Sequence, residues 1–161
     1  MLFRSVDDLR AGPIRLTFQD GELRYLRVGR KEIVRRVYLA VRDRNWDTVM
    51  PQFTEAKVRK GERSFEIDLA ARCHNDVAGY RWTGRIVGTA AGKITFTVHG
   101  ETTRAFKSPR VGFCVLYGAE SLAGQAYETE SPDGGTDKST FPEAVSYGLL
   151  RKHGTYRARA Y

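Results

Sequence analysis

The sequence predicts an all-β protein, folded as a two-layer antiparallel β-sandwich with at most one or two short helices. Apolar and polar residues alternate with a period of two from residue 14 to about residue 127, which is typical of half-buried strands. Short turn signals separate the alternating runs, and they leave no room for the crossovers that parallel strands need. Because each sheet must bury its apolar face, we expect two sheets packed face to face in a supersandwich-like arrangement.

The first stretch with a local structural signal is SVDDLRAG. Ser5 can act as an N-cap, Asp8 occupies the third helical position and Gly12 can end a helix, so the stretch predicts one short helix or a turn. The next two runs, PIRLTF and ELRYLRVG, flank Asp20 and Gly21. Asp-Gly readily adopts the positive φ angles of a tight turn, so these two runs predict a hairpin.

Alternation continues through KEIVRRVYLAVRD, EAKVRKGE, SFEIDLAA, VAGYRWTGRIVG and KITFTVHG. Turn signals near residues 76, 91 and 100 accompany the last three runs, which predicts a meander of antiparallel neighbours. The side chains expected to face the core are Ile33, Val37, Leu39 and Val41 in the first run, Phe65, Ile67 and Leu69 in the third, Tyr80, Trp82 and Ile86 in the fourth, and Ile94, Phe96 and Val98 in the fifth.

The run RVGFCVLYG is apolar on both of its faces. Val111, Phe113 and Val115 lie on one face, and Cys114 and Leu116 lie on the other. A strand that is apolar on both faces is expected to lie centrally in the sandwich. Arg110 would then stand at the mouth of a buried strand, where it either pairs with an acid of a nearby polar cluster or binds an anionic group of a ligand.

The length and the distribution of charge predict one folded domain followed by a basic C-terminal tail. The 161 residues suit a single domain, and we expect residues 1–146 to form the sandwich. Residues 147–161 carry four basic residues and no acid, so they are expected to be a basic tail outside the core. Half of the net charge of +8 lies in this tail, and the sequence contains neither a run of five like charges nor an RRM-like aromatic motif. A nucleic-acid partner is therefore not expected.

The sequence also predicts a cytoplasmic location. No apolar run approaches the ~20 residues of a membrane span, and MLFRSVDDLRAG carries two acids where a signal peptide has its apolar stretch. We therefore expect no membrane partner, and Cys73 and Cys114 as reduced thiols. The three histidines are dispersed, and neither metal-ligand spacing nor a phosphate-binding glycine motif occurs, so no metal or cofactor is expected.

One stretch, YLAVRDRNWDTVMP, is not explained by strand formation. It places Arg42, Asp43, Asn45, Trp46 and Asp47 at the end of an apolar strand, as a polar cluster around one indole. Such a cluster can hold a sugar by stacking on the indole, with charged groups on the hydroxyls. In the alternative interpretation, Trp46 plugs the open end of the sandwich and the Arg and Asp side chains pair across it.

Together with Arg110, these five residues are the predicted substrate-binding residues, and no catalytic residue is predicted. Asp43 and Asp47 are a close carboxylate pair, but a glycosidase-type dyad needs a defined separation between its two carboxyl groups. Four residues of loop do not define such a separation. A catalytic dyad is therefore not favoured.

Several stretches resemble the N-terminal domain of the D-apionate lactonase family. They are LTFQDGELRYLRVGRKEIVRRVYLAVRDRNWDTVMP, RVGFCVL, AGQ and DGG followed by FPEAVS, and the likeness covers roughly residues 10–146. Its most specific part is the run from Gly21 to Pro51. The resemblance implies much longer bacterial chains, in which a β-sandwich precedes a barrel-like middle domain and a further β domain. It also implies hydrolysis of a sugar-acid lactone, a carboxylic ester hydrolase activity, in apiose breakdown.

Two features depart from the family pattern. Tyr117 and Gly118 stand where a family-like chain would show His and Pro after the strand, which weakens the transfer of a ligand role to this strand end. After FPEAVS the family pattern continues as Pro-rich, aromatic sequence, whereas here the basic tail follows. We therefore expect a truncated member that is non-catalytic by itself, with the missing C-terminal catalytic domain as its partner. A sandwich without that neighbour is expected to self-associate through exposed apolar surface. The alternative to a truncated member is a short protein whose basic tail lies on the surface or ends in a frayed helix.

Two other functional classes are compatible with the sequence. The first is an autonomous carbohydrate-binding module that stacks a sugar on Trp46, Trp82 or a tyrosine. An exposed aromatic strip would favour this class, and burial of these rings between the sheets would count against it. The second is a basic nucleic-acid-binding β domain, whose affinity would depend on the tail arginines and fall steeply with salt.

Overall fold

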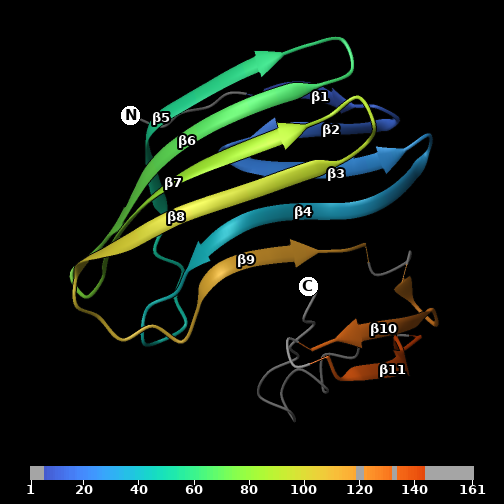
Figure 1. The fold of residues 1–161 in the computed structure, drawn as a ribbon. Coiled ribbons are helices and arrows are strands. Elements are labelled where there is room, and N and C mark those ends of the chain that lie inside the picture. The colour runs from blue at the N-terminus through green and yellow to red at the C-terminus, as the bar shows by residue number, and fades with distance from the viewer. Residues whose placement is uncertain (1–5, 119–121, 132–133, 144–161) are drawn as a thin grey trace. The chain divides into compact units, whose positions relative to one another are not determined.

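The computed structural model describes residues 6–118, 122–131 and 134–143, and its ordered elements are β-strands joined by turns and loops (Figure 1). The strands form a five-stranded sheet of order β1-β2-β3-β4-β9, a four-stranded sheet of order β5-β6-β7-β8 and a two-stranded sheet of β10 and β11. All pairs are antiparallel, which confirms the predicted all-β sandwich. Their bounds are β1 Val6–Ala11, β2 Ile14–Gln19, β3 Glu22–Val28, β4 Lys31–Val41, β5 Pro51–Lys60, β6 Phe65–His74, β7 Gly79–Gly88, β8 Ile94–Arg104, β9 Val111–Leu116, β10 Ala126–Glu130 and β11 Thr136–Thr140.

The chain divides into two compact units, residues 1–116 and residues 117–161. The first unit contains the two larger sheets, and the second contains the hairpin of β10 and β11, in which Tyr127 and Phe141 stack with ring centroids 4.5 Å apart. The predicted division into residues 1–146 and 147–161 stays a prediction. The basic tail lies outside the described residues.

The first strand corrects the interpretation of SVDDLRAG. Val6–Ala11 is strand β1 and not a short helix or a turn, and it pairs along its whole length with β2. Leu9 and Ala11 are two residues apart and both are buried, which is the period of a strand. A full ladder of backbone hydrogen bonds with β2 outweighs the local capping signal, because a helix of one or two turns is unstable on its own. Gly12, at φ 54°, makes the turn into β2.

The second hairpin confirms the Asp-Gly prediction. Asp20 and Gly21 have φ angles of 52° and 79°, and they join β2 to β3 by a two-residue turn. Gly21 also lies directly on the ring of Phe53 in β5, because an added Cβ would be 1.9 Å from Phe53 Cζ. The tip of this hairpin therefore contacts the opposite sheet.

A pair of bulges corrects one expected core residue. The register between β2 and β3 shifts at Tyr25, whose φ is 54°, so that Leu26 rather than Tyr25 is buried. The register between β3 and β4 shifts beside Leu26 as well. As a result Val34 packs against the core, while Ile33, which strict alternation predicts to face inward, is 36% exposed. A bulge adds one residue to a strand and so reverses the faces beyond it.

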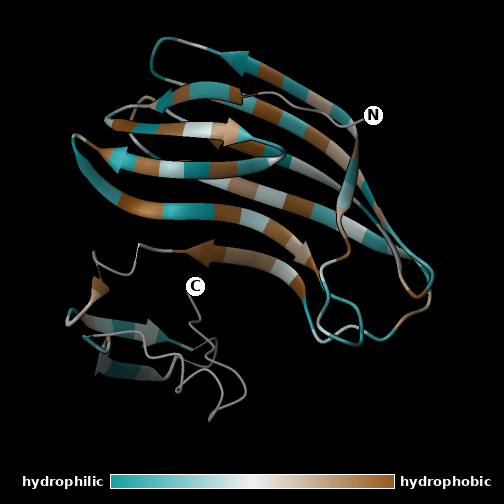
Figure 2. Cartoon of the chain, turned by 180° about the vertical axis from the view of Figure 1, so that it is seen from behind, coloured by the Kyte–Doolittle hydropathy of each residue, from teal (hydrophilic) through white to brown (hydrophobic). Residues whose placement is uncertain are grey.

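The core lies between the five-stranded and four-stranded sheets, and bands of opposite hydropathy alternate along the strands (Figure 2). Each fully buried Leu, Ile or Phe side chain contributes roughly 1.5–3 kcal/mol to stability. The alternation prediction is confirmed for all of its other residues. The buried or partly buried members are Val37, Leu39 and Val41 of β4, Phe65, Ile67 and Leu69 of β6, Tyr80, Trp82 and Ile86 of β7, and Ile94, Phe96 and Val98 of β8.

Strand β9 does not take the central position that its sequence predicts. It is an edge strand that pairs only with β4 among the described strands. Val111 and Phe113 belong to its inner face, yet Phe113 is 44% exposed. Its ring packs on Phe96 of β8, with centroids 4.9 Å apart. The sandwich is therefore open along the side formed by β8 and β9, and the apolar inner face of β9 lies at that opening.

The contact between Gly21 and Phe53 gives a first prediction. Gly21→Ala should lower the free energy of unfolding by about 2–4 kcal/mol, because a positive φ costs about 1 kcal/mol and overpacking a further 1–3 kcal/mol. Gly29→Ala is the matched control, since Gly29 has φ 59° and nothing within 4 Å of an added Cβ. It should cost only about 1 kcal/mol. Urea unfolding followed by circular dichroism measures both, and equal losses would contradict the contact.

Candidate functional site

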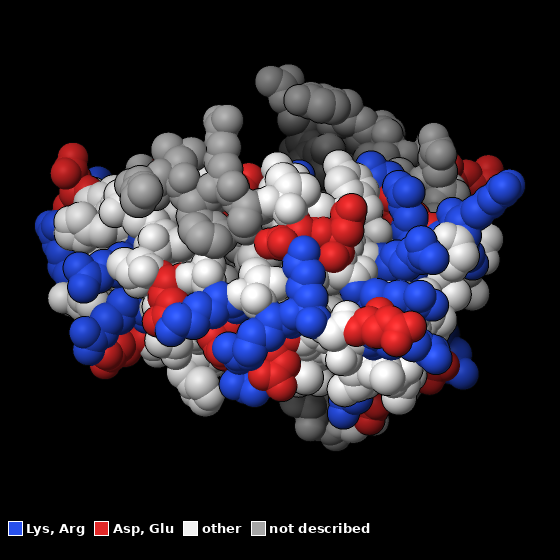
Figure 3. Space-filling model, turned by 90° about the horizontal axis from the view of Figure 1, so that it is seen from above, with Lys and Arg blue, Asp and Glu red and all other residues white. Residues whose placement is uncertain are grey.

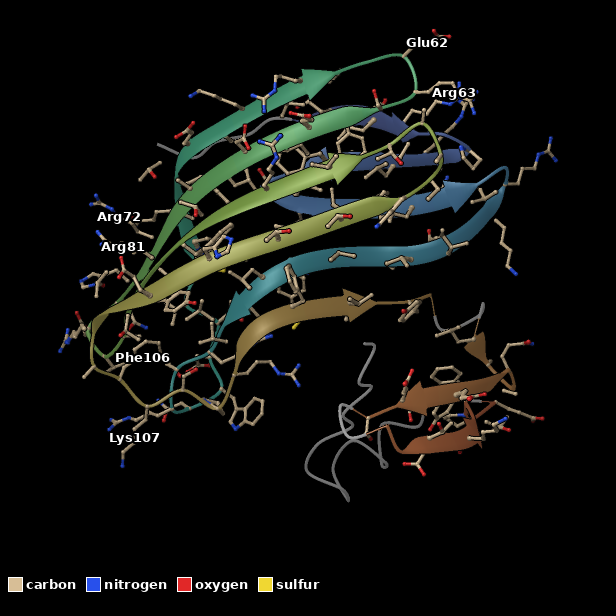
Figure 4. All side chains as sticks on the ribbon, in the orientation of Figure 1. Glu62, Arg63, Arg72, Arg81, Phe106 and Lys107 are labelled. Carbon is tan, nitrogen blue, oxygen red and sulfur yellow. The ribbon has the colours of Figure 1, made fainter. Side chains whose placement is uncertain are left out.

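The chain passes between the two larger sheets at two places that lie side by side. Residues 42–50 lead from β4 to β5, and residues 105–110 lead from β8 back to β9 (Figure 1). We call these two segments together the crossing junction. Phe106 and Lys107, labelled in Figure 4, belong to the second segment, and Phe106 packs against the core while Lys107 is exposed.

Backbone hydrogen bonds hold the two segments of the crossing junction together. Arg42 N donates to Arg110 O at 2.9 Å. The Ser108 hydroxyl lies 2.5 Å from Arg42 O and 2.9 Å from Arg110 O, and it accepts a hydrogen bond from Arg110 N at 3.2 Å. Two residues that are far apart in the sequence, Arg42 and Arg110, are thereby fixed next to each other.

Asp43 shapes the first segment. Its carboxylate oxygen Oδ1 accepts hydrogen bonds from Asn45 N at 2.9 Å and from Asp47 N at 3.1 Å. Its backbone N–H donates to Asp47 O at 3.0 Å, and its carbonyl accepts from Trp46 N at 3.0 Å. Asp43 is only 5% exposed, whereas Trp46, held at φ 70°, is 47% exposed. The carboxylate therefore organises the loop that presents the indole to solvent.

The two predicted arginines are held by polar groups rather than by acids. Arg42 donates through Nη1 to Thr48 Oγ1, and its Nη2 lies 3.5 Å from the hydroxyl of Tyr38. Arg110 Nη1 lies 3.9 Å from Cys114 Sγ. Among the described residues neither guanidinium forms an ion pair with a carboxylate, so the predicted pairing of Arg and Asp across the loop does not occur there.

Tyr38 and Cys114 complete the cluster, and sequence reasoning missed both as site residues. They pair directly across β4 and β9 on the outer face of the sheet. Burial raises the pKa of Tyr38, and a hydrogen bond with Cys114 raises it further, so the phenol is protonated at neutral pH. The Arg36 guanidinium stacks over the Tyr38 ring at 4.1 Å. Alternation along RRVYLAVRD places Arg36 and Tyr38 on the face of Arg42, but only the pairing with β9 adds Cys114.

The crossing junction thus supplies hydrogen-bond donors and one exposed ring. Arg42 and Arg110 contribute two guanidinium groups, and Trp46 offers a flat apolar surface in the first segment, whereas the neighbouring Arg36 of β4 is ion-paired with Glu22. Arginine forks suit carboxylates and other oxyanions, and an exposed indole suits the face of a sugar. Asn45 and Asp47 are exposed in the same loop.

Trp82 cannot serve as the stacking platform considered above. It is only 3% exposed and packs edge-on against Phe53, with ring centroids 5.7 Å apart. Its Nε1 has no hydrogen-bond partner within the described part of the chain. The indole N–H lies near Cys73, where it favours the thiolate form and so acts to lower the pKa of that thiol. Burial has the larger effect on Cys73 and raises the pKa of its thiol. In the described ranges no three His, Cys, Asp or Glu side chains gather as metal ligands.

The fold and the crossing junction define an antiparallel β-sandwich domain with a cationic, aromatic loop cluster where the chain changes sheets. A family model described as the N-terminal domain of D-apionate lactonase matches residues 3–149, and the chain belongs to this family. It is 32% identical over 138 residues to a D-apionate lactonase of Brucella anthropi. The match covers 85% of this chain and 23% of that relative, so the chain spans less than a quarter of the longer protein.

No solved structure matches the chain. No helix in residues 6–118, 122–131 or 134–143 is long and apolar enough to cross a membrane.

The role of Asp43 gives a second prediction. Asp43→Ala should lower the free energy of unfolding by about 2–4 kcal/mol, because two backbone N–H groups lose a charged acceptor. Asp43→Asn keeps an acceptor oxygen and should lose less. Asp47→Ala, at an exposed position of the same loop, should change the stability by no more than about 0.5 kcal/mol. Denaturant unfolding followed by tryptophan fluorescence compares the three, and a larger loss for Asp47→Ala would refute the assignment.

Proposed function

We propose that this chain is the N-terminal β-sandwich domain of a D-apionate lactonase-like hydrolase of sugar-acid catabolism, acting in the cytoplasm on a lactone of the apiose series. The family match carries the proposal, together with a relative that is a lactonase more than four times as long as the matched part. The domain is non-catalytic by itself in this proposal. Its contribution is to pack against the catalytic part of a full-length chain and to border the substrate site.

The composition of the crossing junction supports a non-catalytic role. Hydrolysis of a lactone needs an activated water or nucleophile, and donors that stabilise the developing oxyanion. The junction supplies donors through its arginines. Its two carboxylates are less suited to act as a base, because Asp43 is committed to two backbone N–H groups and Asp47 stands on the exposed loop. The raised pKa of Tyr38 keeps this phenol from acting as a base near neutral pH.

The same junction suits the product of lactone opening. Hydrolysis converts a neutral lactone into a carboxylate with several hydroxyl groups. Arg42 and Arg110 carry guanidinium groups without a carboxylate partner in the described residues, and a carboxylate would fit them by charge-assisted hydrogen bonds. Trp46 would cover the apolar face of the sugar-acid chain. The crossing junction would thus form the rim of a site whose reactive groups come from the rest of the full-length lactonase.

The open side of the sandwich supports contact with that remaining part. Val111 and Phe113 of β9 expose core-facing side chains, and Phe96 of β8 is only partly buried beside them. Exposed apolar surface of this kind marks an interaction site in a stable protein. The occupant we propose is the catalytic part of a full-length lactonase, because more than three quarters of the relative lies outside the matched region.

A carbohydrate-binding module is the second candidate, favoured by the exposure of Trp46. This function would require affinity for neutral sugars. The burial of Trp82 removes the second ring of the expected aromatic strip. The two candidates therefore differ in the ligand charge that they require.

Binding and turnover by the isolated chain give the third prediction. The chain should not hydrolyse D-apionate lactone above the rate in buffer, but it should bind D-apionate more tightly than neutral apiose. Arg42→Gln or Arg110→Gln should weaken D-apionate binding about tenfold, the effect of losing one charge-assisted hydrogen bond. Arg44→Gln, an exposed charge in the same loop, is the matched control and should leave binding unchanged. Calorimetric titration measures all four proteins.

The outcomes of this experiment separate the candidates. Turnover by the chain alone would overturn the non-catalytic role. Equal binding of apiose and D-apionate, abolished in Trp46→Ala, would replace the proposal by the carbohydrate-binding module. An equal effect of Arg44→Gln would mean that only net charge matters.

The open side gives the fourth prediction. At high concentration the isolated chain should self-associate through β8 and β9, since the apolar surface lacks its partner. Phe113→Arg should shift the protein towards the monomer in sedimentation velocity. Met50→Arg is the control, because Met50 is exposed and apolar but lies in the first segment of the crossing junction. Equal effects of the two variants would show that the β9 face is not the contact.

A further inference from the structure

The outer face of the five-stranded sheet carries three arginines in one row. Arg10 of β1 lies directly opposite Arg15 of β2, and Arg15 lies directly opposite Arg27 of β3. Neighbouring strands are about 4.8 Å apart, so the row spans about 10 Å across the sheet. We call these three residues the arginine row. Its position differs from that of the crossing junction.

The arginine row works against stability. Like charges directly opposite each other on a sheet are destabilising, whereas opposite charges stabilise it. On the four-stranded sheet like charges also meet, because Arg72 lies opposite Arg81, but there Arg81 is ion-paired with Glu101, and other cross-strand positions pair opposite charges. There Asp68 lies opposite Arg85, and Arg85 contacts both Glu66 at 3.0 Å and Asp68 at 3.3 Å. On the face seen in Figure 3, basic and acidic side chains are likewise interspersed.

The side chains of the arginine row leave donor groups free. Arg10 uses Nε to donate to Gly12 O at 2.9 Å, and Arg27 lies 3.6 Å from Glu32 at the far end of the row. Arg15, at the centre, has no hydrogen bond or ion pair with any described residue. Both of its Nη groups can therefore bind a ligand.

The arginine row lines a surface depression of about 610 Å³. Tyr25, Lys60 and Ser64 line the same depression, so a ring, an ammonium and a hydroxyl stand around the guanidiniums. Tyr25 is placed there by its bulge, with its ring 5.8 Å from the Arg27 guanidinium.

Acidic groups also border the depression, and one of its ends is fastened to the opposite sheet. Asp8 accepts a hydrogen bond from Thr17 Oγ1 at 3.2 Å, and Glu62 lines the depression from the turn between β5 and β6. Glu62 and Arg63, labelled in Figure 4, mark this turn, and Gly12 N donates to Arg63 O at 2.9 Å. The basic side chains that line the depression outnumber these acids two to one.

We propose that the arginine row and its depression bind an anion with two linked phosphoryl groups. Guanidinium forks bind phosphate oxygens bidentately. The Lys60 ammonium beside them is ion-paired with Asp7 at 2.6 Å, so the three guanidinium groups carry the proposed binding. A single phosphate can engage two neighbouring forks, but a row of about 10 Å offers a third fork that only a longer anion reaches. The ligand class is therefore a diphosphate, free or as part of an organic diphosphate.

Calorimetric titration of the whole chain with inorganic pyrophosphate tests the proposal. Pyrophosphate should bind at least tenfold more tightly than orthophosphate, and acetate should bind least. Arg15→Gln should weaken pyrophosphate binding at least tenfold. The pyrophosphate affinity of Arg15→Lys should lie between that of the unmodified chain and that of Arg15→Gln. Arg85→Gln, which removes one positive charge from the paired face of the other sheet, should leave the affinity within twofold of the unmodified protein.

Thermal melting provides a second readout that a structural role of Arg15 would not reproduce. At low salt Arg15→Gln should melt at the same temperature as the unmodified chain or higher, because a like-charge contact is removed. Pyrophosphate should raise the melting temperature of the unmodified chain but not that of Arg15→Gln.

Several results would overturn the proposal. The first is equal affinity for pyrophosphate and orthophosphate, and the second is an equal loss of pyrophosphate affinity in Arg15→Gln and Arg85→Gln. The third is a melting temperature below that of the unmodified chain in both Arg15→Gln and Arg15→Lys. The fourth is binding of a short DNA duplex without binding of pyrophosphate. None of these results bears on the lactonase assignment, which the titrations with D-apionate test separately.

Discussion

The burial of one face of each large sheet against the other is the constraint on which the rest of the structure depends. Two antiparallel sheets can share one core only if every inward position fits the opposite layer. Gly88 shows how tight this fit is, because an added Cβ there would lie 2.2 Å from the ring of Phe65. Interiors packed at this density tolerate added volume poorly. Positions that bear on function are therefore left to the outer faces, the edges and the loops that join the sheets.

The crossing junction follows from the same constraint. A chain that builds two facing sheets must pass from one to the other, and here it does so twice at the same end of the sandwich. The second passage returns the chain beside the first, and Ser108 fixes the two segments together. Arginines that are far apart in the sequence thereby meet around Tyr38 and Cys114. A cluster of donors beside an exposed indole is thus a product of topology.

The outer faces show two ways of arranging charge on a sheet. On the four-stranded sheet Arg59 and Arg85 share Glu66 and Asp68, so that the charges neutralise each other. On the five-stranded sheet Glu22 joins Arg24 and Arg36 in the same manner. The arginine row on that sheet lacks such a balance at its centre. The unpaired charge of Arg15 lies beside Tyr25, which a bulge places in the same depression. The excess of positive charge is therefore found at the depression.

The sequence by itself determined most of the strands of the two larger sheets, most of their inward faces and the family. Period-two alternation fixes which side of a strand is apolar, and Asp20 with Gly21 fixes a tight turn, because both depend on residues that are neighbours in the chain. The polar cluster from Arg42 to Asp47 was also recognisable as the stretch that strand formation does not explain, although its carboxylate Asp43 proved to organise the loop.

Tertiary structure decided what depends on pairing between distant strands. The register shifts that turn Val34 instead of Ile33 towards the core arise from the contacts of β3 with both of its neighbours. The pairing of β1 with β2 replaces a helix signal that is only local. The edge position of β9 depends on which strand takes the last place in the sheet, and an apolar pattern cannot reveal this because an edge and a centre can show the same alternation. Register and strand order are set by the combined free energy of many long-range contacts, and this sum cannot be read from any short stretch of the chain.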